Sequence, residues 1–424
     1  MSENERVKAI SQTIDVNRDA AIVMLKALVQ APSITGAEEP AQDVVETLFR
    51  ARGLEVDRWE ATPQEIEPYY WHVGEETVFE GRPNVVGKRT SSGKGRSILL
   101  NAHMDTVDYG DESLWTHPPL SGVVDGDLLF GRGSCDMKGG LVTYLMALGA
   151  LDQLGIRLAG DVIIAATVGE ENGGVGALST ILRGYRADAA LITEPTRLAL
   201  VPAQGGSLVL RLTIRGRSAH GAVRDEGVSA VEKFIPIFQD LLAFEKERNN
   251  SLQHPLYQHL PNKIPISFGV VRAGTWASTV PEELVAEGRI GLIPGEDVDE
   301  FRHAVLNRIM TVADRDDWLR EHRPEIEWFG GQFAPAETPV NAPISQAVIA
   351  AHAQVTGSEP PVEGVPYGAD MRLFTLLGVM PCVMYGAGDV RVAHHVDEYI
   401  SITDLLTAAK TIAVLLVDWC GVES

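Results

Sequence analysis

The chain has 424 residues, a formal net charge of −22, 45% hydrophobic residues and 22% charged residues. This length exceeds what one hydrophobic core normally supports, so two domains are expected in a folded protein of ordinary composition. The negative charge argues against nucleic acid and anionic membrane surfaces as partners, because both would repel the chain. The chain has too few cysteines for a disulfide framework, no apolar leader and no stretch of roughly 20 apolar residues. These features predict a cytoplasmic protein.

The first hundred residues predict helices followed by strands. Residues 16–52 predict a helix, a break at Ala31–Ser33 and a second helix, and apolar side chains between Ile22 and Val29 lie on one face at helical spacing. Short strands are expected at Leu54–Trp59, Asn84–Gly87 and Arg96–Ala102. The segment Ala61–Gly81 is rich in glutamate and aromatic residues, and its pattern predicts no element.

The next segment alternates strands with a helix. Buried strands are expected at Asp161–Val168 and Ala189–Thr193, and a helix is expected from Met137 to Leu154. This alternation is typical of an α/β domain with a mainly parallel mixed sheet flanked by helices. Such sheets bind ligands at the carboxyl ends of their strands.

The pattern changes after Gly205–Gly206 and changes back after Gly330. The intervening residues predict a β-α-β-β-α-β order, which indicates an inserted ferredoxin-like α+β domain. We therefore expect a discontinuous catalytic domain at residues 1–206 and 331–424, with the insert at 207–330. The expected elements of the insert are strands at Leu208–Ile214, Ile266–Val271, Glu283–Ile293 and Glu325–Trp328, and helices at Val228–Glu247 and Val298–Ala313. Beyond it, helices are expected at Ile344–Val355, Met371–Leu377 and Thr403–Leu416, and a strand at Pro381–Tyr385.

A histidine and an aspartate follow the strand at Arg96–Ala102. His103 and Asp105 are two residues apart, so in an extended chain they point to the same side. An imidazole can bind a metal through one nitrogen while a carboxylate fixes its tautomer through the other. A core histidine bonded to an aspartate remains the simpler alternative for this pair alone.

A glycine-rich run at Gly131–Gly140 lies where the helix expected from Met137 begins. It matches neither common nucleotide-binding pattern, so nucleotide binding is not expected. Asp136 is either a simple helix cap or a carboxylate that bridges two metal ions. Cys135 is more simply a small packed residue than a nucleophile.

Acidic residues also follow two further apolar strands. Glu170 and Glu171 follow Asp161–Val168, and Glu194 follows Ala189–Thr193. Two adjacent carboxylates repel one another in a dry cleft unless a cation or proton lies between them, although a solvated acidic turn is commoner. His394 belongs to a later cluster, His394–Glu398. Jointly, such groups at gathered strand ends predict a metal site.

The motifs resemble one known family. HxDxV at His103–Val107, DMKGG at Asp136–Gly140, GEExG at Gly169–Gly173, TEPT at Thr193–Thr196 and GRSAHGA at Gly216–Ala222 occur in that order. Together with HxxDE at His394–Glu398, they resemble the acetylornithine deacetylase, succinyl-diaminopimelate desuccinylase, aminoacylase and glutamate carboxypeptidase family of two-zinc hydrolases. The resemblance runs from about Leu25 to the C-terminus.

The resemblance implies a site with two zinc ions, or cobalt or manganese, bridged by Asp136. Glu170 would be the general base and Asp105 the partner of His103. The insert would act as a lid and dimerisation domain, which implies a homodimer. The implied metal ligands are His103 and Glu194 for one ion, Glu171 and His394 for the other, and Asp136 for both.

Three further residues are implied to contact substrate. His220 would stabilise the oxyanion from across the dimer, and Arg289 and Arg372 would bind substrate carboxylates, which the planar guanidinium suits. Either arginine could equally form a surface ion pair. Ser278 stands where family members often carry asparagine, which puts a substrate contact there in doubt.

These expectations favour a metal-dependent amidohydrolase that removes an acetyl, succinyl or formyl group from a small N-acylated, amino acid-like substrate. A metallo-carboxypeptidase or dipeptidase of the same family is the main alternative. A non-catalytic metal-binding protein is the remote alternative, because such a protein would be expected to lose the base or a ligand. Glu170 and all five ligand positions are filled here.

Overall fold

The computed structural model describes residues 2–75 and 78–423. The chain divides into two compact units. The first comprises residues 1–203, 337–363 and 369–424, and the second comprises residues 204–336 and 364–368. The second unit extends beyond 207–330 because its first and last strands in the sequence, β9 (Gly206–Arg215) and β12 (Glu325–Phe333), are longer than predicted. No helix within the described residues is both long enough and apolar enough to cross a membrane.

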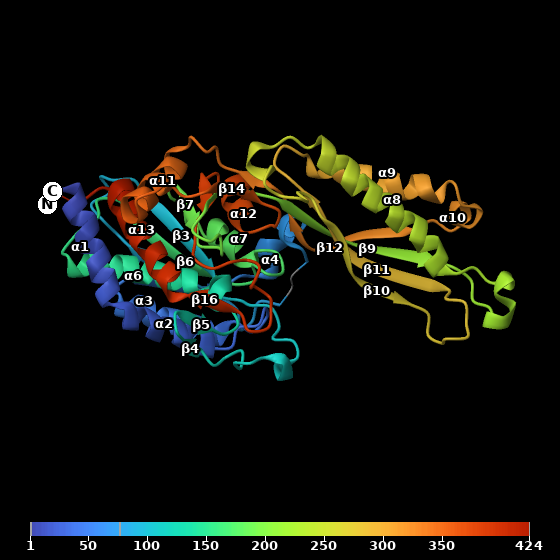
Figure 1. Cartoon of the computed structure of the whole chain (residues 1–424), viewed down its shortest axis with the longest axis horizontal. Coiled ribbons are helices and arrows are strands. Elements are labelled where there is room, and N and C mark those ends of the chain that lie inside the picture. The colour runs from blue at the N-terminus through green and yellow to red at the C-terminus, as the bar shows by residue number, and fades with distance from the viewer. Residues whose placement is uncertain (1, 76–77, 424) are drawn as a thin grey trace. The chain divides into compact units, whose positions relative to one another are not determined.

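A nine-stranded mixed sheet forms the centre of the first unit, which confirms the predicted α/β class (Figure 1). Its order is β1-β2-β6-β3-β7-β15-β8-β13, with β14 beside β8. Strands β6, β3, β7 and β15 run parallel, whereas β1, β2 and β8 add antiparallel pairs. The bounds are β1 Glu55–Glu60, β2 Pro83–Arg89, β3 Ile98–His103, β6 Val162–Thr167, β7 Ala190–Ile192, β8 Leu200–Gln204, β13 Ala336–Glu337, β14 Val362–Val365 and β15 Cys382–Met384.

Helices flank this sheet. Helix α6 (Gly139–Gln153) is apolar around most of its surface and is buried from Gly139 to Leu151 between β3 and helix α13 (Ile402–Cys420). It begins two residues later than predicted because Asp136 and Met137 have non-helical backbone angles. The helix α1 was not predicted. The remaining helices are α1 Glu3–Val16, α2 Arg18–Gln30, α3 Glu39–Ala51, α4 Pro63–Ile66, α5 Tyr70–Val73, α7 Val175–Leu182, α11 Pro343–Thr356 and α12 Met371–Leu376.

A small three-stranded sheet joins two distant parts of the first unit. Strand β16 (Tyr399–Ser401) pairs with β5 (Leu128–Phe130), which pairs with β4 (Val124–Asp125). This pairing brings the residues before β16 beside those after β5, and the Gly131 amide donates to the Glu398 carbonyl at 2.8 Å. None of these strands was predicted.

The second unit has the predicted ferredoxin-like order of elements. The sheet runs β10-β11-β9-β12, with every neighbouring pair antiparallel. Helices α8 and α9 lie on one side of it (Figure 1). Along β9, apolar residues such as Leu210 and Leu212 face the helices, and residues such as Arg211 alternate with them. The other bounds are α8 Ala230–Ser251, β10 Ile266–Ala273, β11 Glu283–Leu292, α9 Val298–Ala313 and α10 Asp317–Glu321.

Candidate metal centre

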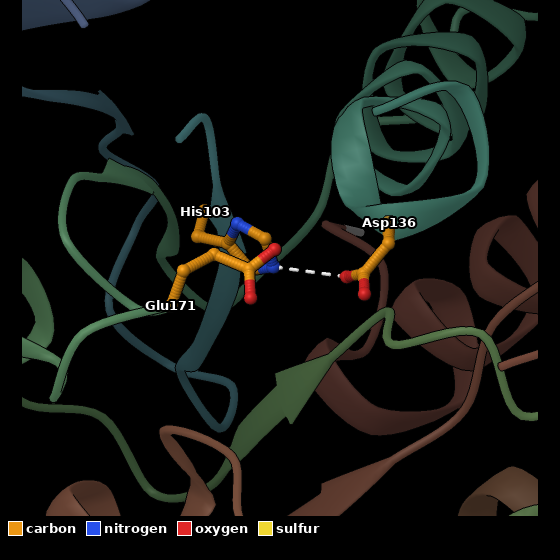
Figure 2. A group of neighbouring side chains, drawn as sticks. All are labelled: His103, Asp136 and Glu171. Atoms are coloured by element: carbon orange, nitrogen blue, oxygen red, sulfur yellow. Dashed lines mark hydrogen bonds and ion pairs between the residues drawn. The ribbon is translucent and has the colours of Figure 1, made fainter. Parts of the chain in front are cut away.

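Three predicted metal ligands converge at one end of the central sheet. His103 is the last residue of β3, Glu171 follows β6, and Asp136 precedes α6. One possible ligand atom from each lies within 4.8 Å of the others. Figure 2 shows the three side chains turned toward one another, with His103 Nε2 3.1 Å from Asp136 Oδ1. The carboxyl ends of the adjacent parallel strands β3 and β6 therefore bring His103 and Glu171 together, and Asp136 joins them from the loop before α6.

The other two predicted ligands lie in the same unit. His394 Nε2 is 3.1 Å from Glu171 Oε1 and 3.5 Å from Asp136 Oδ2. Glu194 follows β7, is 4% exposed, and its Oε1 has no hydrogen-bond partner among the described residues. Burial raises the pKa of Glu194, and the charge of Asp136 adds to the rise. Short distances thus join His103, Asp136, Glu171 and His394 into one cluster, and Glu194 interacts with it through charge.

The cluster carries more buried negative charge than its histidines balance. Burial, together with the charge of Asp136, raises the pKa of Glu171 and of Glu194 above the ordinary glutamate value. The carboxylates of Asp136 and Glu171 raise the pKa of His394 to about 10. A divalent cation would relieve this repulsion, and imidazole with carboxylate is a ligand set that suits zinc. The residues present therefore fit a metal.

Asp105 connects the histidine to the loop after β6. His103 Nδ1 lies 2.9 Å from the Asp105 main-chain oxygen and 3.5 Å from its Oδ1. The Asp105 carboxylate also accepts hydrogen bonds from the backbone amides of Glu170, at 3.1 Å, and Glu171, at 3.0 Å. A proton held at Nδ1 leaves Nε2 free to bind a metal. Asp105 therefore orients both the imidazole and the acidic turn.

Glu170 is a buried acidic residue beside the predicted ligand Glu171. Its side chain is 7% exposed, and its pKa is well above the ordinary value because of burial and the nearby charges of Glu194 and Glu171. The preceding Gly169 has a φ of +68°, and a Cβ there would come within 2.7 Å of Val175. This turn therefore requires glycine, and it places Glu170 and Glu171 consecutively at the strand end.

Glu398 positions the metal-site loop, a role that the sequence analysis did not assign to it. Its fully buried carboxylate accepts hydrogen bonds from the amides of Cys135, at 2.9 Å, and Asp136, at 3.1 Å, and pairs with Arg132 at 2.8 Å. Its place in the motif His394–Glu398 was visible in the sequence. The sequence did not show that the Glu398 side chain points to the loop of Asp136, because that direction depends on the pairing of β5 with β16.

Two further residues of the glycine-rich run have structural roles. Lys138 is buried and donates to the carbonyls of Leu28, at 2.9 Å, and Ala31, at 3.0 Å, and burial lowers its pKa to about 7. It thereby ties the end of α2 to the start of α6. Cys135 is 1% exposed, and burial raises the pKa of its thiol well above the usual value, as expected for a packed residue and not for a nucleophile.

His220 and Arg289, implied to contact substrate, lie in the second unit. His220 precedes a turn in which its Nδ1 accepts a hydrogen bond from the Ala222 amide at 3.1 Å. The neighbouring Gly221 amide donates to the Ser278 carbonyl at 2.7 Å, so these two motifs are side by side. Arg289 lies on β11, is half-buried, and donates to the Pro366 carbonyl at 3.0 Å. The substrate contacts of His220 and Arg289 stay predictions.

Arg372 lies in the first unit, at the start of α12. Its side chain is 1% exposed and donates to the main-chain carbonyls of Ala369, His72 and Gly173. Burial lowers its pKa to about 10. These bonds neither require nor test the predicted contact with a substrate carboxylate.

Comparison with known proteins identifies the relatives of this chain. The sequence profile of Peptidase family M20/M25/M40 matches residues 99–418, more than half of the chain. An N-formyl-4-amino-5-aminomethyl-2-methylpyrimidine deformylase from Bacillus subtilis is 27% identical over 441 residues, which cover 99% of each protein. An acetylornithine deacetylase from Myxococcus xanthus is 29% identical, over 80% of this chain and 84% of that protein.

Solved structures share the fold. A dipeptidase from Saccharomyces cerevisiae superposes with a TM-score of 0.79 at 15% identity, and the match covers 99% of each chain. A metallo-carboxypeptidase from Sulfolobus solfataricus, described as a member of family M20, gives a TM-score of 0.73 at 19% identity, over 93% of this chain and 98% of that one.

Proposed function

Because the chain belongs to Peptidase family M20/M25/M40, it is a hydrolase of linear amides, and we propose that it removes a short acyl group from a small N-acylated substrate. The single observation that carries this proposal is the convergence of His103, Asp136 and Glu171 beside the buried Glu170. The deformylase and deacetylase names of the relatives, which match most of the chain, support acyl removal over peptide cleavage.

We propose that the cluster holds two zinc ions, with cobalt or manganese as possible replacements. Asp136 would bridge them, with His103 and Glu194 on one side and Glu171 and His394 on the other. When bound, such a pair lowers the pKa of a bound water toward about 7 and polarises the scissile carbonyl.

The residues of the chain would carry the proton and hold the substrate. Glu170 takes a proton from the attacking water on its carboxylate and delivers it to the departing amine nitrogen. Asp105 holds the imidazole of His103 and the amides of the acidic turn in place. His220 of a second copy of the chain would donate to the developing oxyanion, and Arg289 would pair with a substrate carboxylate.

A substrate panel tests this proposal. The zinc-loaded protein is assayed with N-formyl, N-acetyl and N-succinyl compounds beside dipeptides of matched amine portion, with chelator-treated protein as the control. We expect metal-dependent release of the free amine from at least one acyl compound, with a kcat/KM well above that for any dipeptide. Preference for dipeptides would overturn the deacylase assignment in favour of a peptidase. Absence of any turnover at full metal occupancy would favour a non-catalytic protein.

We also propose that the protein acts in the cytoplasm as a homodimer formed through the second unit. The expected family contribution of His220 across a dimer supports this arrangement. Light scattering coupled to gel filtration would show a mass of twice the 45.9 kDa chain. A monomeric mass together with full activity would contradict it.

A further inference from the structure

Helix α5 (Tyr70–Val73) packs directly against the turn that carries two site residues. Gly173 lies two residues after Glu171, and a Cβ added there would come 2.0 Å from the Val73 carbonyl oxygen. Gly173 also has a φ of +141°, which side chains other than hydrogen rarely allow. The backbone of α5 is therefore in van der Waals contact with the end of the Glu170–Gly173 turn.

Arg372 holds these two pieces of backbone together. One guanidinium nitrogen, Nη2, donates to the Gly173 carbonyl at 2.6 Å and to the His72 carbonyl at 3.2 Å. The other, Nη1, donates to the Ala369 carbonyl at 2.9 Å. Three carbonyls engage both terminal nitrogens of a guanidinium that is only 1% exposed. Arg372 is thus placed as a clamp between α5 and the acidic turn.

The clamped segment presents aromatic side chains. Trp71 is 53% exposed, and Tyr70 and His72 are half-buried. The flat apolar face of an indole suits an unsaturated ring. Helix α5 adjoins the end of the turn that carries Glu170 and Glu171 through the contact of Val73 with Gly173.

We propose that α5, held by Arg372, forms one wall of the substrate site and selects substrates whose amine portion carries an aromatic ring. Trp71 and His72 supply the ring contact. Arg372 is a positioning residue in this account, in place of the substrate contact implied by family resemblance. The inference rests on the proposed function, because it assigns the amine portion of the substrate of that same site.

Selectivity between two substrates tests the ring contact. The zinc-loaded enzyme is assayed with N-formyl-4-amino-5-aminomethyl-2-methylpyrimidine and with N-formyl-ornithine, which share the acyl group and differ in the amine portion. In Trp71→Ala we expect the ratio of kcat/KM values, ring over aliphatic, to fall about tenfold, mainly through KM. Trp71→Phe should retain most of the ratio. Val16→Ala, a change at the exposed end of α1, is the control and should leave both constants unchanged. An unchanged ratio in Trp71→Ala would overturn the ring contact.

Hydrogen exchange tests the clamp without an activity readout. Arg372→Lys keeps the positive charge but removes the planar guanidinium that donates to three carbonyls. In this variant we expect faster exchange of backbone amides in residues 70–75 than in wild type. Exchange in α13 should match wild type, which shows that the variant has folded. Unchanged exchange in residues 70–75, with a raised KM only for substrates that carry a carboxylate, would return Arg372 to a substrate contact.

The substrate panel separates this inference from the proposed function. One outcome is that wild type cleaves acyl compounds while Trp71→Ala leaves the ratio of kcat/KM values, ring over aliphatic, unchanged. That result would reject the role of α5 in substrate selection and retain the deacylase function. If wild type cleaves only dipeptides, deacylation is wrong. The same variants, compared on dipeptides with aromatic and aliphatic carboxy-terminal residues, then decide whether α5 selects rings.

Discussion

Charged side chains are paired on the sheet of the second unit and poorly compensated near the metal ligands of the first. On the second unit's sheet, Arg211 pairs with Glu287 at 2.8 Å and with Glu327 at 2.7 Å, all on partly exposed side chains. In the first unit, Glu194 is buried and one of its oxygens has no partner among the described residues. Exposed pairs contribute little to stability, whereas a buried carboxylate without compensation is costly. Buried, poorly compensated charge therefore marks the functional region, and paired surface charge does not.

The largest expected effect comes from the acid beside the ligands. In Glu170→Gln, we expect kcat to fall about 10²- to 10⁴-fold because the side chain can no longer accept a proton. Metal content should equal that of wild type, since the residue is not a predicted ligand. The measurement is steady-state kinetics alongside elemental analysis of the same sample. Activity near wild type would remove Glu170 from the role of base.

Substitutions in the core of the second unit should lower the free energy of unfolding. Leu212 is fully buried between the sheet and its helices, so Leu212→Ala should destabilise the protein by about 2–5 kcal/mol through the cavity that remains. Arg211, the preceding residue, is on the opposite face, and Arg211→Ala should leave the free energy of unfolding close to wild type. Denaturant unfolding measures both. Equal effects would mean that the two faces of β9 are misassigned.

Glu398 tests whether positioning residues matter as much as ligands. Glu398→Gln keeps the shape of the side chain but weakens its bonds with Arg132 and with the amides of Cys135 and Asp136. We expect the metal affinity to fall about 10- to 100-fold, as for other groups that orient metal ligands. Competition with a fluorescent zinc chelator measures the affinity. An unchanged affinity would show that Asp136 needs no such support.

The smallest effect concerns a buried histidine away from the cluster. His352 Nδ1 lies 2.7 Å from the Tyr385 hydroxyl, and burial lowers the pKa of His352 below 6.5. The unfolded chain therefore binds this proton more readily, so wild type loses stability as the pH falls below about 6.5. His352→Gln does not have this pH-dependent loss of stability. The difference in the free energy of unfolding between wild type and His352→Gln should therefore narrow from pH 7.5 to pH 5. A gap that widens would mean that the folded histidine prefers its charged form.

Local patterns predicted the parts of the structure that depend on local order. The apolar runs that form β3, β6 and β7 indicated parallel strands, and acidic or histidine residues directly after them indicated convergence at one sheet edge. The fold class and the family expectation are confirmed. The order of strands and helices in the second unit was readable for the same reason, since each element is long enough to show its period.

What the sequence did not reveal depends on contacts between distant residues. Strands β5 and β16 are three residues each, too short for an alternation pattern, and their pairing alone directs Glu398 to the loop of Asp136. The segment Ala61–Gly81 showed no period because α4 and α5 span four residues each. Residues 76–77 of that segment lie outside the described residues. The bonds of Arg372 likewise depend on three chain segments meeting.

Metal stoichiometry tests the central claim most directly. Protein stripped with a chelator is dialysed against excess zinc, passed through a desalting column and analysed for zinc per chain. We predict about two zinc ions in wild type and in Glu170→Gln, and fewer in Asp136→Ala, which removes the proposed bridge. Wild type that retains no zinc, or an Asp136→Ala variant that retains as much as wild type, would contradict the account.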